Sequence, residues 1–478
     1  MLINPPVPSN QAWVREGRCQ QWDIWGAPFP PLSLALISTQ LVRSGVQTRI
    51  LDSGPEGKSC EQVLQECKLF KPKMAILATV TPTIDTDLAW FAGGLRKRIP
   101  GIRIAVIGIH VSVLPVDVLD RFSAVDYVIM GEPEITSKEL ASSLFHGHPS
   151  IQNVFGIAYR AENGTIRVNP QRPLVSDVDS LGLPDWIKID FGFYQLPLVN
   201  RPFSLIVFAR GCPFECRFCA SHVYNGRRLR KRSIKSLLGE IHFNLKLGVR
   251  DFLFWTEQMT LDRTYLDEFL EALLAEGLHN QIRWVCNSRV DCAEVPLFRK
   301  MKQAGCWQIA FGFEFGNDRI LELACKGGRS SVKQSRAAAK AAHQAGLVVD
   351  GHFILGYPGE TVRTLQQTID LACSLPLTFA HFYPAVPFPG SQLYEEALAN
   401  GWIEPLQWTA ISQDMSCLMM SELSPGVVKD YIRKAYRRFY LRPETIMRVL
   451  RIPHSAGDYL NMVRLGLRII RAKVLCAS

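Results

Sequence analysis

The sequence predicts an α/β protein with a doubly wound, Rossmann-like first domain, a full or partial β/α barrel after it, and a helical C-terminal region. Two observations predict this class. Short apolar runs alternate with helical patterns over residues 1–145 and again over 203–384, and the chain becomes mainly helical after about residue 385. A length of 478 residues exceeds one ordinary domain, and 47% hydrophobic residues suffice for large cores.

Five apolar runs predict the strands of the first domain. They are bounded by Gly, Pro or Asp and lie at 1–4, 46–52, 73–80, 102–108 and 126–131. Helical spacing that ends in glycine predicts helices over 32–45 and 85–101. This alternation predicts a parallel sheet, and ligands of such sheets bind beyond the carboxyl ends of the strands. A hairpin with Asn163-Gly164 at its turn follows, and then a linker.

The second half repeats the alternation. Strands are expected at 204–209, 250–255, 281–287, 307–313, 348–355 and 378–384, with helices at 233–247, 262–275, 293–305, 330–345 and 361–375. Six parallel strands with intervening helices predict a barrel whose site lies at the carboxyl ends of its strands. The predicted divisions of the chain are 1–148, 149–200 for hairpin and linker, 201–390 for the barrel, and 391–478.

Composition restricts the compartment and the partners. The start MLINPPVPSN lacks the features of a signal peptide, and no run of about 18 apolar residues predicts a spanning helix. The 13 cysteines therefore predict metal or catalytic roles in a reducing cytoplasm. Nearly all of the net charge of +10 lies between Lys429 and Lys473. That distribution fits an anionic surface, and we expect no nucleic-acid partner.

Three cysteines directly follow the first strand of the predicted barrel. Cys212, Cys216 and Cys219 have the spacing C-x3-C-x2-C, and three thiolates can hold three irons of a [4Fe–4S] cluster. The fourth iron would then be open to another ligand. The alternative is a closed Cys3His zinc site that includes His222. The place of the motif after a barrel strand favours the cluster.

The segment GCPFECRFCASH, with the aromatic Phe218 before its last cysteine, resembles the radical SAM superfamily. The resemblance extends over about residues 200–400 and implies that the three cysteines hold a [4Fe–4S] cluster. It also implies that the open iron binds the amino and carboxylate groups of S-adenosylmethionine (SAM), whose cleavage gives a 5′-deoxyadenosyl radical. His222 then has no ligand role.

Four further strand ends resemble SAM-binding segments of that superfamily. They are FLFWTEQMTLD, WVCNSRVD, FGFEFGNDRIL and HFILGYPGET. The resemblance implies that the contacts to SAM come from Thr256, Glu257, Ser288, Arg289, Glu314, Leu355 and Gly356. Two positions depart from the family pattern, because Thr256 replaces one of two adjacent acids and Phe315 replaces a serine. Taken singly, such residues are more often ion-pair partners, caps or turns.

The first domain resembles the cobalamin-binding domain that precedes the barrel in one radical SAM subclass. PPLSLALISTQLVRSGVQTRILD, GIHVSVLP and DYVIMGEPEIT carry this resemblance. It implies cobalamin contacts from Thr79, Thr81, Gly108, His110, Gly131, Glu132 and Glu134. Ile107 and Pro133 stand where many relatives have glycine. No cobalt-ligand motif surrounds His110, so a hydrogen bond within its loop is the alternative role for this side chain.

Together these resemblances imply a cobalamin-dependent radical SAM methyltransferase that methylates an unactivated carbon through the 5′-deoxyadenosyl radical and methylcobalamin. The expected partners are a small-molecule or lipid-like substrate and an external reductant such as flavodoxin or ferredoxin. One alternative is a radical oxidative cyclase, or another radical rearrangement of a lipid, tetrapyrrole or natural product. A second alternative is a zinc-stabilised cobalamin or nucleotide sensor without catalysis.

The remaining expectations concern the second half of the chain. His381, Tyr383 and Tyr394 are candidate substrate contacts, although both tyrosines fit packing roles equally well. Buried thiols are expected at Cys286, Cys292, Cys306 and Cys325. The basic run NGRRLRKR, residues 225–232, is expected to be a solvated loop.

The tail has apolar positions at helical spacing and arginines on another face. The apolar set is Leu460, Val463, Leu467, Ile470 and Val474, and the basic set is Arg464, Arg468 and Arg471. Two interpretations stay open for this helix: peripheral contact with an anionic membrane, or docking on the barrel with solvated arginines.

Overall fold

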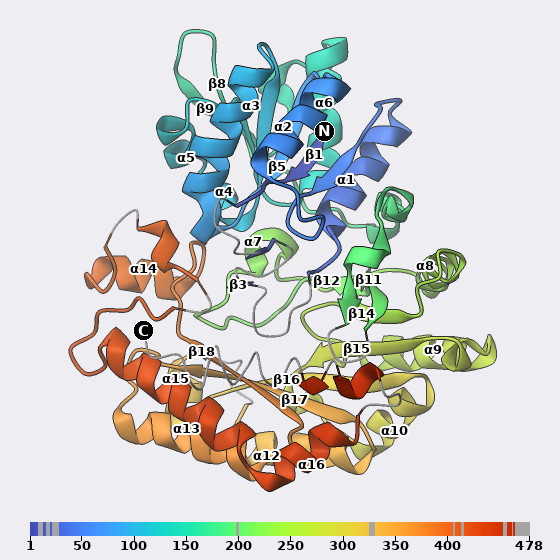
Figure 1. Ribbon diagram of the computed structural model, residues 1–478, viewed down its shortest axis with the longest axis vertical. Coiled ribbons are helices and arrows are strands. Elements are labelled where there is room, and N and C mark those ends of the chain that lie inside the picture. The colour runs from blue at the N-terminus through green and yellow to red at the C-terminus, as the bar shows by residue number, and fades with distance from the viewer. Residues whose placement is uncertain are drawn as a thin grey trace.

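The computed structural model describes residues 1–7, 13–15, 20–21, 28–196, 200–324, 330–404, 407–412, 415–452, 457–460 and 462–463 (Figure 1). Two seven-stranded sheets organise these residues, one in each half of the chain. The predicted fold class is confirmed: a doubly wound sheet precedes a partial β/α barrel, and helices follow.

The first sheet has the strand order β4-β1-β5-β6-β7-β8-β9, and its first five strands are parallel. These five are β4 (Ile50–Asp52), β1 (Leu2–Asn4), β5 (Met74–Ala78), β6 (Arg103–Ile107) and β7 (Tyr127–Ile129). The helices are α1 (Leu32–Arg43), α2 (Cys60–Phe70), α3 (Gly93–Arg98), α4 (Ile109–Val113), α5 (Pro115–Arg121) and α6 (Pro133–His146), with a π-helical turn at Thr86–Ala92.

Alternate side chains of these strands enter two different cores. Ile76 packs with the apolar residues of α1 and α6, whereas Leu77 packs with those of α2 and α3. Because successive side chains of a strand point to opposite faces, a continuous apolar run is required when helices cover both faces. This explains the apolar strands of the sequence and the double winding.

The hairpin of the sequence extends this first sheet. β8 (Ile157–Arg160) pairs antiparallel with β7, and β9 (Ile166–Val168) pairs antiparallel with β8. Both strands were expected to stand apart from the first domain, but their backbone hydrogen bonds make them its edge. A two-stranded ribbon also forms from β2 (Trp13–Val14) and β3 (Gln20–Gln21).

The second sheet has the order β10-β11-β14-β15-β16-β17-β18. The strands are β10 (Gln195–Leu196), β11 (Arg201–Val207), β14 (Asp251–Trp255), β15 (Arg283–Ser288), β16 (Cys306–Glu314), β17 (Val348–Leu355) and β18 (Phe379–Pro384). The strands from β11 to β18 are parallel, and β10 pairs antiparallel with β11. Among the described strands β11 and β18 do not pair, so the barrel is partial.

Helices follow the barrel strands as predicted. They are α8 (Ile234–Lys246), α9 (Arg263–Ala275), α10 (Val295–Gln303), α12 (Val332–Gln344) and α13 (Val362–Ser374). Short elements that the sequence did not predict are β12 (Ala209–Arg210), α7 (His222–Asn225), β13 (Arg230–Lys231) and α11 (Asp318–Leu323). Figure 1 shows α7 between the two halves of the molecule.

The C-terminal region covers the open edge of the barrel. It contains α14 (Gln392–Ala399), α15 (Pro425–Tyr440) and α16 (Pro443–Leu450), and α15 packs on β18 and α13. The Tyr440 hydroxyl accepts a hydrogen bond from the Ala380 N–H at 3.2 Å and lies 3.1 Å from the Ala380 carbonyl. These bonds occupy backbone groups that an exposed edge strand would leave unpaired.

Only part of the predicted tail helix is described. Leu460 and Val463 are exposed, and the other apolar and basic residues of its two faces lie outside the described residues. In the described part of the chain, no helix combines the length and the apolar character needed to cross a membrane.

Candidate active site

One large cavity lies between the carboxyl ends of the two sheets. Residues that follow β5, β6 and β7 line it from the first sheet, and residues that follow β11, β14 and β15 line it from the second. Its empty volume is about 2620 Å³, which includes space open to solvent. Both predicted ligand-binding edges therefore face a single space.

The three cysteines of the motif line this cavity from the loop between β12 and α7. Gly211 shapes the loop: its φ is 103°, and a Cβ there would come within 2.1 Å of the Arg228 carbonyl oxygen. The Cys212 N–H donates to the Gly226 carbonyl at 3.1 Å, which closes the loop. The sequence thus folds locally so that all three thiols face the same space.

Burial raises the pKa of the Cys212 thiol to about 11 and also raises the pKa of Cys219. Thiolates are the form that binds iron, so the positive charge of a metal is needed to stabilise them here. His222 begins α7 and does not line the cavity. Among the described residues, these cysteines and His222 do not form a compact ligand group around one ion. The arrangement fits a cluster better than a closed zinc site.

Thr256 and Glu257 follow β14 and line the cavity beside the cysteines. The Asn225 amide donates to the Glu257 carboxylate at 2.5 Å, and burial raises the pKa of Glu257. Thr256 is buried, and its hydroxyl accepts a weak bond from the Gln258 N–H at 3.4 Å. An acid held by one amide in a buried place can accept a further hydrogen bond from a cationic amino group.

Ser288 and Arg289 lie at the end of β15 and also line the cavity. The Ser288 hydroxyl is hydrogen-bonded to the Thr260 hydroxyl. The Arg289 guanidinium pairs with Asp291 at 3.0 Å and stacks over the Phe214 ring at 3.7 Å. Because Phe214 belongs to the cysteine loop, Arg289 is fixed against that loop by a cation–π contact.

Glu314 ends β16 with an unusual backbone. Its φ is 62°, and the pairing of β16 with β17 shifts register between Gly312 and Glu314. A bulge of this kind re-aims a side chain, and strained backbone is concentrated at functional sites. Glu314 and Phe218 both line the cavity, as the resemblance implied.

Three of the predicted cofactor contacts do not line the cavity. Leu355 is fully buried in the core because it points to the helix-covered face of β17, and its neighbour Ile354 faces the cavity instead. Gly356 has a φ of 83° and packs against Val428, and its N–H donates to Glu360 at 2.8 Å. Gly131 lies behind the cavity wall, where its N–H donates to the Ser112 hydroxyl at 3.1 Å.

On the side of the first sheet, Gly108 and His110 form a cradle. Gly108 has a φ of 143°, and a Cβ there would lie 2.2 Å from the Thr79 carbonyl oxygen. His110 is 1% exposed, neither of its ring nitrogens has a hydrogen-bond partner among the described residues, and burial lowers its pKa to about 3. The alternative role as a loop hydrogen-bonder is therefore wrong. Two unpaired nitrogens at the wall of a cavity fit a bound cofactor.

The neighbouring loop after β5 is held by a buried carboxylate. Asp87 accepts hydrogen bonds from Thr79 at 2.8 Å and from Thr83 at 2.7 Å, and it pairs with Arg15. Thr79 and Thr81 line the cavity, and so does Arg15, which the sequence did not suggest. Fixed loops of this kind can hold a large planar ligand in one place.

Glu132 and Glu134 line the cavity but already have charged partners. Arg210 pairs with Glu132 at 2.8 Å and with Glu134 at 2.5 Å, and Arg230 pairs with Glu132 at 2.9 Å. The basic run 225–232 is therefore not a simple solvated loop, because Arg230 and Arg232 are buried. The sequence could not show the pairing of Arg230, because its partner Glu132 is 98 residues distant, whereas Arg232 pairs with Glu240 only eight residues further along the chain.

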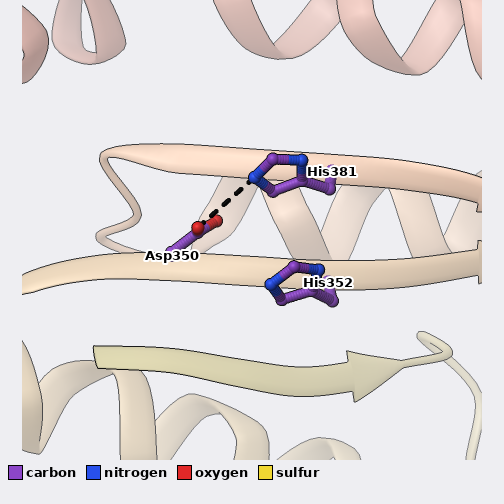
Figure 2. A group of neighbouring side chains, drawn as sticks. All are labelled: Asp350, His352 and His381. Carbon is purple, nitrogen blue, oxygen red and sulfur yellow. Dashed lines mark ion pairs between the residues drawn. The ribbon is translucent and has the colours of Figure 1, made fainter. Parts of the chain in front are cut away.

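Asp350, His352 and His381 form the one compact group of metal-ligand types among the described residues (Figure 2). Their ligand atoms lie within 4.8 Å of one another, and His381 Nε2 is 3.3 Å from Asp350. The two imidazole rings are stacked, with centroids 4.8 Å apart and planes 8° apart. A metal lies in the plane of each ring that binds it, so stacked parallel rings cannot share one ion without turning.

This group instead forms part of the cavity wall. His352 and Tyr383 line the cavity, whereas His381 lies beside His352 on the neighbouring strand and does not line it. The Tyr383 ring is parallel to both imidazoles, within 7°. Tyr394 does not reach the cavity and packs near Trp408, which is a packing role. The sequence missed His352, although it stands opposite His381 on neighbouring predicted strands.

Among the described residues, the other cysteines lie outside the cavity. Cys286 and Cys306 are buried on neighbouring strands, as expected. Cys292 is half-buried beside Asp291, so the expectation that its thiol is buried is wrong. Cys325 lies outside the described residues.

Comparison with known proteins gives two family matches. The Radical SAM superfamily matches residues 206–372, and the B12 binding domain matches residues 25–141. An uncharacterized methyltransferase of Pyrococcus horikoshii is 31% identical over 426 residues, which cover 88% of this chain and 90% of the relative. The anaerobic magnesium-protoporphyrin IX monomethyl ester cyclase of Rubrivivax gelatinosus is 27% identical, over 86% of this chain and 74% of the cyclase.

A solved structure shares the fold. It is the radical S-adenosylmethionine methyltransferase TsrM of Kitasatospora setae, with cobalamin and a [4Fe–4S] cluster bound. The TM-score is 0.68 at 16% identity, and the match covers 100% of this chain and 92% of TsrM.

Proposed function

This chain belongs to the radical SAM superfamily, in the group that carries a cobalamin-binding domain, and we propose that it methylates an unactivated carbon of a small organic substrate. It is an enzyme whose cofactors are a [4Fe–4S] cluster, SAM and cobalamin. One observation carries the proposal: the cysteine loop and the loops after β5, β6 and β7 line the same cavity.

In this proposal the two sides of the cavity bind different cofactors. Cys212, Cys216 and Cys219 hold the cluster, and Phe218 packs beside them. On the other side, Thr81, Gly108 and His110 receive cobalamin, since Gly108 lets the loop after β6 approach the Thr79 carbonyl closely and His110 offers two unpaired nitrogens. When bound, the cluster with SAM supplies a 5′-deoxyadenosyl radical and cobalamin supplies a methyl group.

The polar groups near the cysteine loop orient SAM. The proposed contacts are Glu257 to its amino group, Arg289 to its carboxylate, and Ser288, Thr256 and Glu314 as further polar contacts. Asn225 fixes the direction of Glu257, and Phe214 and Asp291 fix that of Arg289. Preorganised groups bind one geometry without paying for reorganisation at the moment of reaction.

The wall formed by His352 and Tyr383 is the proposed substrate contact. His352 is stacked beside His381, and His381 Nε2 lies 3.3 Å from the Asp350 carboxylate, contacts that favour one orientation of the rings. Such a wall offers both aromatic surface and hydrogen-bonding edges. It suits a substrate with a flat or polar part. An external reductant, such as flavodoxin or ferredoxin, is a further proposed partner.

Oxidative cyclisation is the second candidate reaction, because the chain is also similar to the magnesium-protoporphyrin IX monomethyl ester cyclase. Both reactions use the same cofactors and the same cavity. They differ in whether a methyl group leaves SAM, so the products of SAM distinguish them.

Anaerobic incubation of the reconstituted protein with SAM and dithionite tests the proposal. We expect 5′-deoxyadenosine and S-adenosylhomocysteine together, and iron near four per chain. 5′-Deoxyadenosine without S-adenosylhomocysteine would favour the cyclase reaction. About one zinc per chain in place of iron would favour the sensor.

Peripheral contact with a membrane stays a prediction. The described support is the exposure of Leu460 and Val463, two residues of the predicted apolar face of the tail. Pelleting with anionic vesicles, compared with a chain truncated after residue 455, tests it. Equal pelleting of the two chains would contradict it.

A further inference from the structure

A network of polar and charged groups, buried at Glu132, Glu134, Arg210 and Arg230, joins the two cofactor sides of the cavity. It begins at the start of α6, where Glu132 is the N-cap residue and Glu134 lies in the first turn, and their side chains are 5% and 2% exposed. It ends at Glu257, the acid that follows β14. Between them lie Arg210 in β12 and Arg230 in β13.

The first links are ion pairs between the two halves. Arg210 uses separate nitrogens for Glu132, at 2.8 Å, and Glu134, at 2.5 Å. Arg230 pairs with the same Glu132 at 2.9 Å. The two arginines come from the antiparallel ribbon of β12 and β13, which frames the cysteine loop.

The next links lead to Glu257. The Arg230 guanidinium donates to the Asn225 carbonyl oxygen at 2.8 Å, and the Asn225 side-chain amide donates to Glu257 at 2.5 Å. Asn225 also precedes Gly226, whose carbonyl accepts from the Cys212 N–H. One residue therefore fixes both the acid and the start of the cysteine loop.

The four ion-paired groups of this network, Glu132, Glu134, Arg210 and Arg230, are buried, whereas Asn225 and Glu257 are half-buried. Removing one partner of a buried ion pair leaves an unpaired charge, which is more costly than the loss of a surface pair. Arg210 also reaches two carboxylates at once, which suits the fixed fork of a guanidinium and not a lysine ammonium. Movement of the β7–α6 loop would thus disturb Arg230, Asn225 and Glu257 in turn.

We propose that Arg210 and Arg230 are positioning residues that lock the cobalamin-side loop to the cysteine loop and to Glu257, so that occupation of one cofactor site favours occupation of the other. This inference rests on the proposed roles of the cavity. Linkage requires the effect to be reciprocal. The basic run 225–232 then has a function: Arg230 belongs to the lock.

The test uses the full-length reconstituted protein with the variants R210M and R230M. R228M is the matched control, since Arg228 belongs to the same basic run and is exposed. The double variant R230M/E132Q removes a buried charge together with its partner. It therefore tests the contact without leaving Glu132 as an unpaired buried charge that could unfold the protein. R210K keeps the positive charge but lacks the planar guanidinium that reaches both Glu132 and Glu134.

Two readouts are compared. The first is SAM titration of the reduced cluster by electron paramagnetic resonance, with and without cobalamin. In the wild type and R228M we expect cobalamin to lower the SAM concentration that produces half of the spectral change by about fivefold or more. In R210M, R230M and R230M/E132Q we expect cobalamin to have no effect on the SAM titration, with the iron content unchanged. In R210K we expect the effect of cobalamin to be smaller than in the wild type. An undiminished cobalamin effect in R230M/E132Q would overturn the inference.

The second readout, amide hydrogen exchange, is independent of catalysis. We expect faster exchange at residues 131–134 and 225–230 in R210M and R230M than in R228M. Equal exchange would overturn the inference. If the wild-type cluster does not respond to SAM at all, the proposed function fails, and exchange alone still decides whether the two arginines lock the loops.

Discussion

Gly108 and Thr79 approach so closely that a Cβ at position 108 would lie 2.2 Å from the Thr79 carbonyl oxygen. The two residues end neighbouring strands, β6 and β5, and both line the cavity. A side chain at position 108 would have to push these strand ends apart.

The substitution Gly108→Ala is therefore expected to abolish cobalamin retention. The φ of 143° alone costs an L residue about 1–3 kcal/mol, before the contact with Thr79 is counted. Cobalamin that stays bound after desalting is the measurement. Gly54→Ala is the control, because a Cβ there meets nothing within 4 Å. Equal retention in both variants would contradict the assignment of this cradle.

Replacing His110 by Phe is expected to flatten the pH dependence of stability. Burial lowers the pKa of His110 from 6.5 to about 3, so the unfolded chain binds the proton first. The contribution of neutral His110 to the free energy of unfolding is therefore complete above pH 6.5. It is lost as the pH falls toward 3. At pH 5 the loss is about 2 kcal/mol, from 1.36 kcal/mol per unit.

Urea unfolding of the wild type and H110F at pH 7 and pH 5 measures this difference. The same variant is expected to retain less cobalamin at pH 7, since it lacks both ring nitrogens. A wild-type slope that persists unchanged in H110F would show that another group titrates.

Cys219→Ala is expected to lose iron and 5′-deoxyadenosine formation together, since one of three cluster thiolates is removed. Cys373→Ala is the matched control, because Cys373 is a half-buried thiol of α13 that does not line the cavity. Iron analysis and anaerobic product analysis are the measurements. Full iron content in C219A would exclude the assigned ligand set.

No additional metal ion is expected at His352 and His381, because their rings are stacked with planes 8° apart. Metal analysis should give equal zinc, manganese and nickel in the wild type and in H381A. An equivalent of metal that is present in the wild type and missing in H381A would show that the rings turn to bind an ion.

The chemistry of the cysteine loop could be predicted because it is local. Cys212, Cys216 and Cys219 lie within eight positions, and the preceding strand fixes where they emerge. Strand-end residues such as Glu257 and Glu314 could be predicted for a related reason, since parallel strands bring their carboxyl ends to one edge.

Leu355 shows where this reasoning fails by one position. Successive side chains of a strand point to opposite faces, so a shift of one residue exchanges the cavity for the core. Ile354 faces the cavity and Leu355 faces the helices. The segment was identified in the sequence, but its register was not.

By itself, the sequence determined the two alternating halves, the three thiols and the strand ends that line the cavity, because each depends on neighbours within a few residues. Only the tertiary structure decided the partners of Glu132, Glu134, Arg210 and Arg230, and the stacking of His352 on His381. Those contacts join residues from different elements, and the free energy of burying a charge is set by what the fold brings beside it.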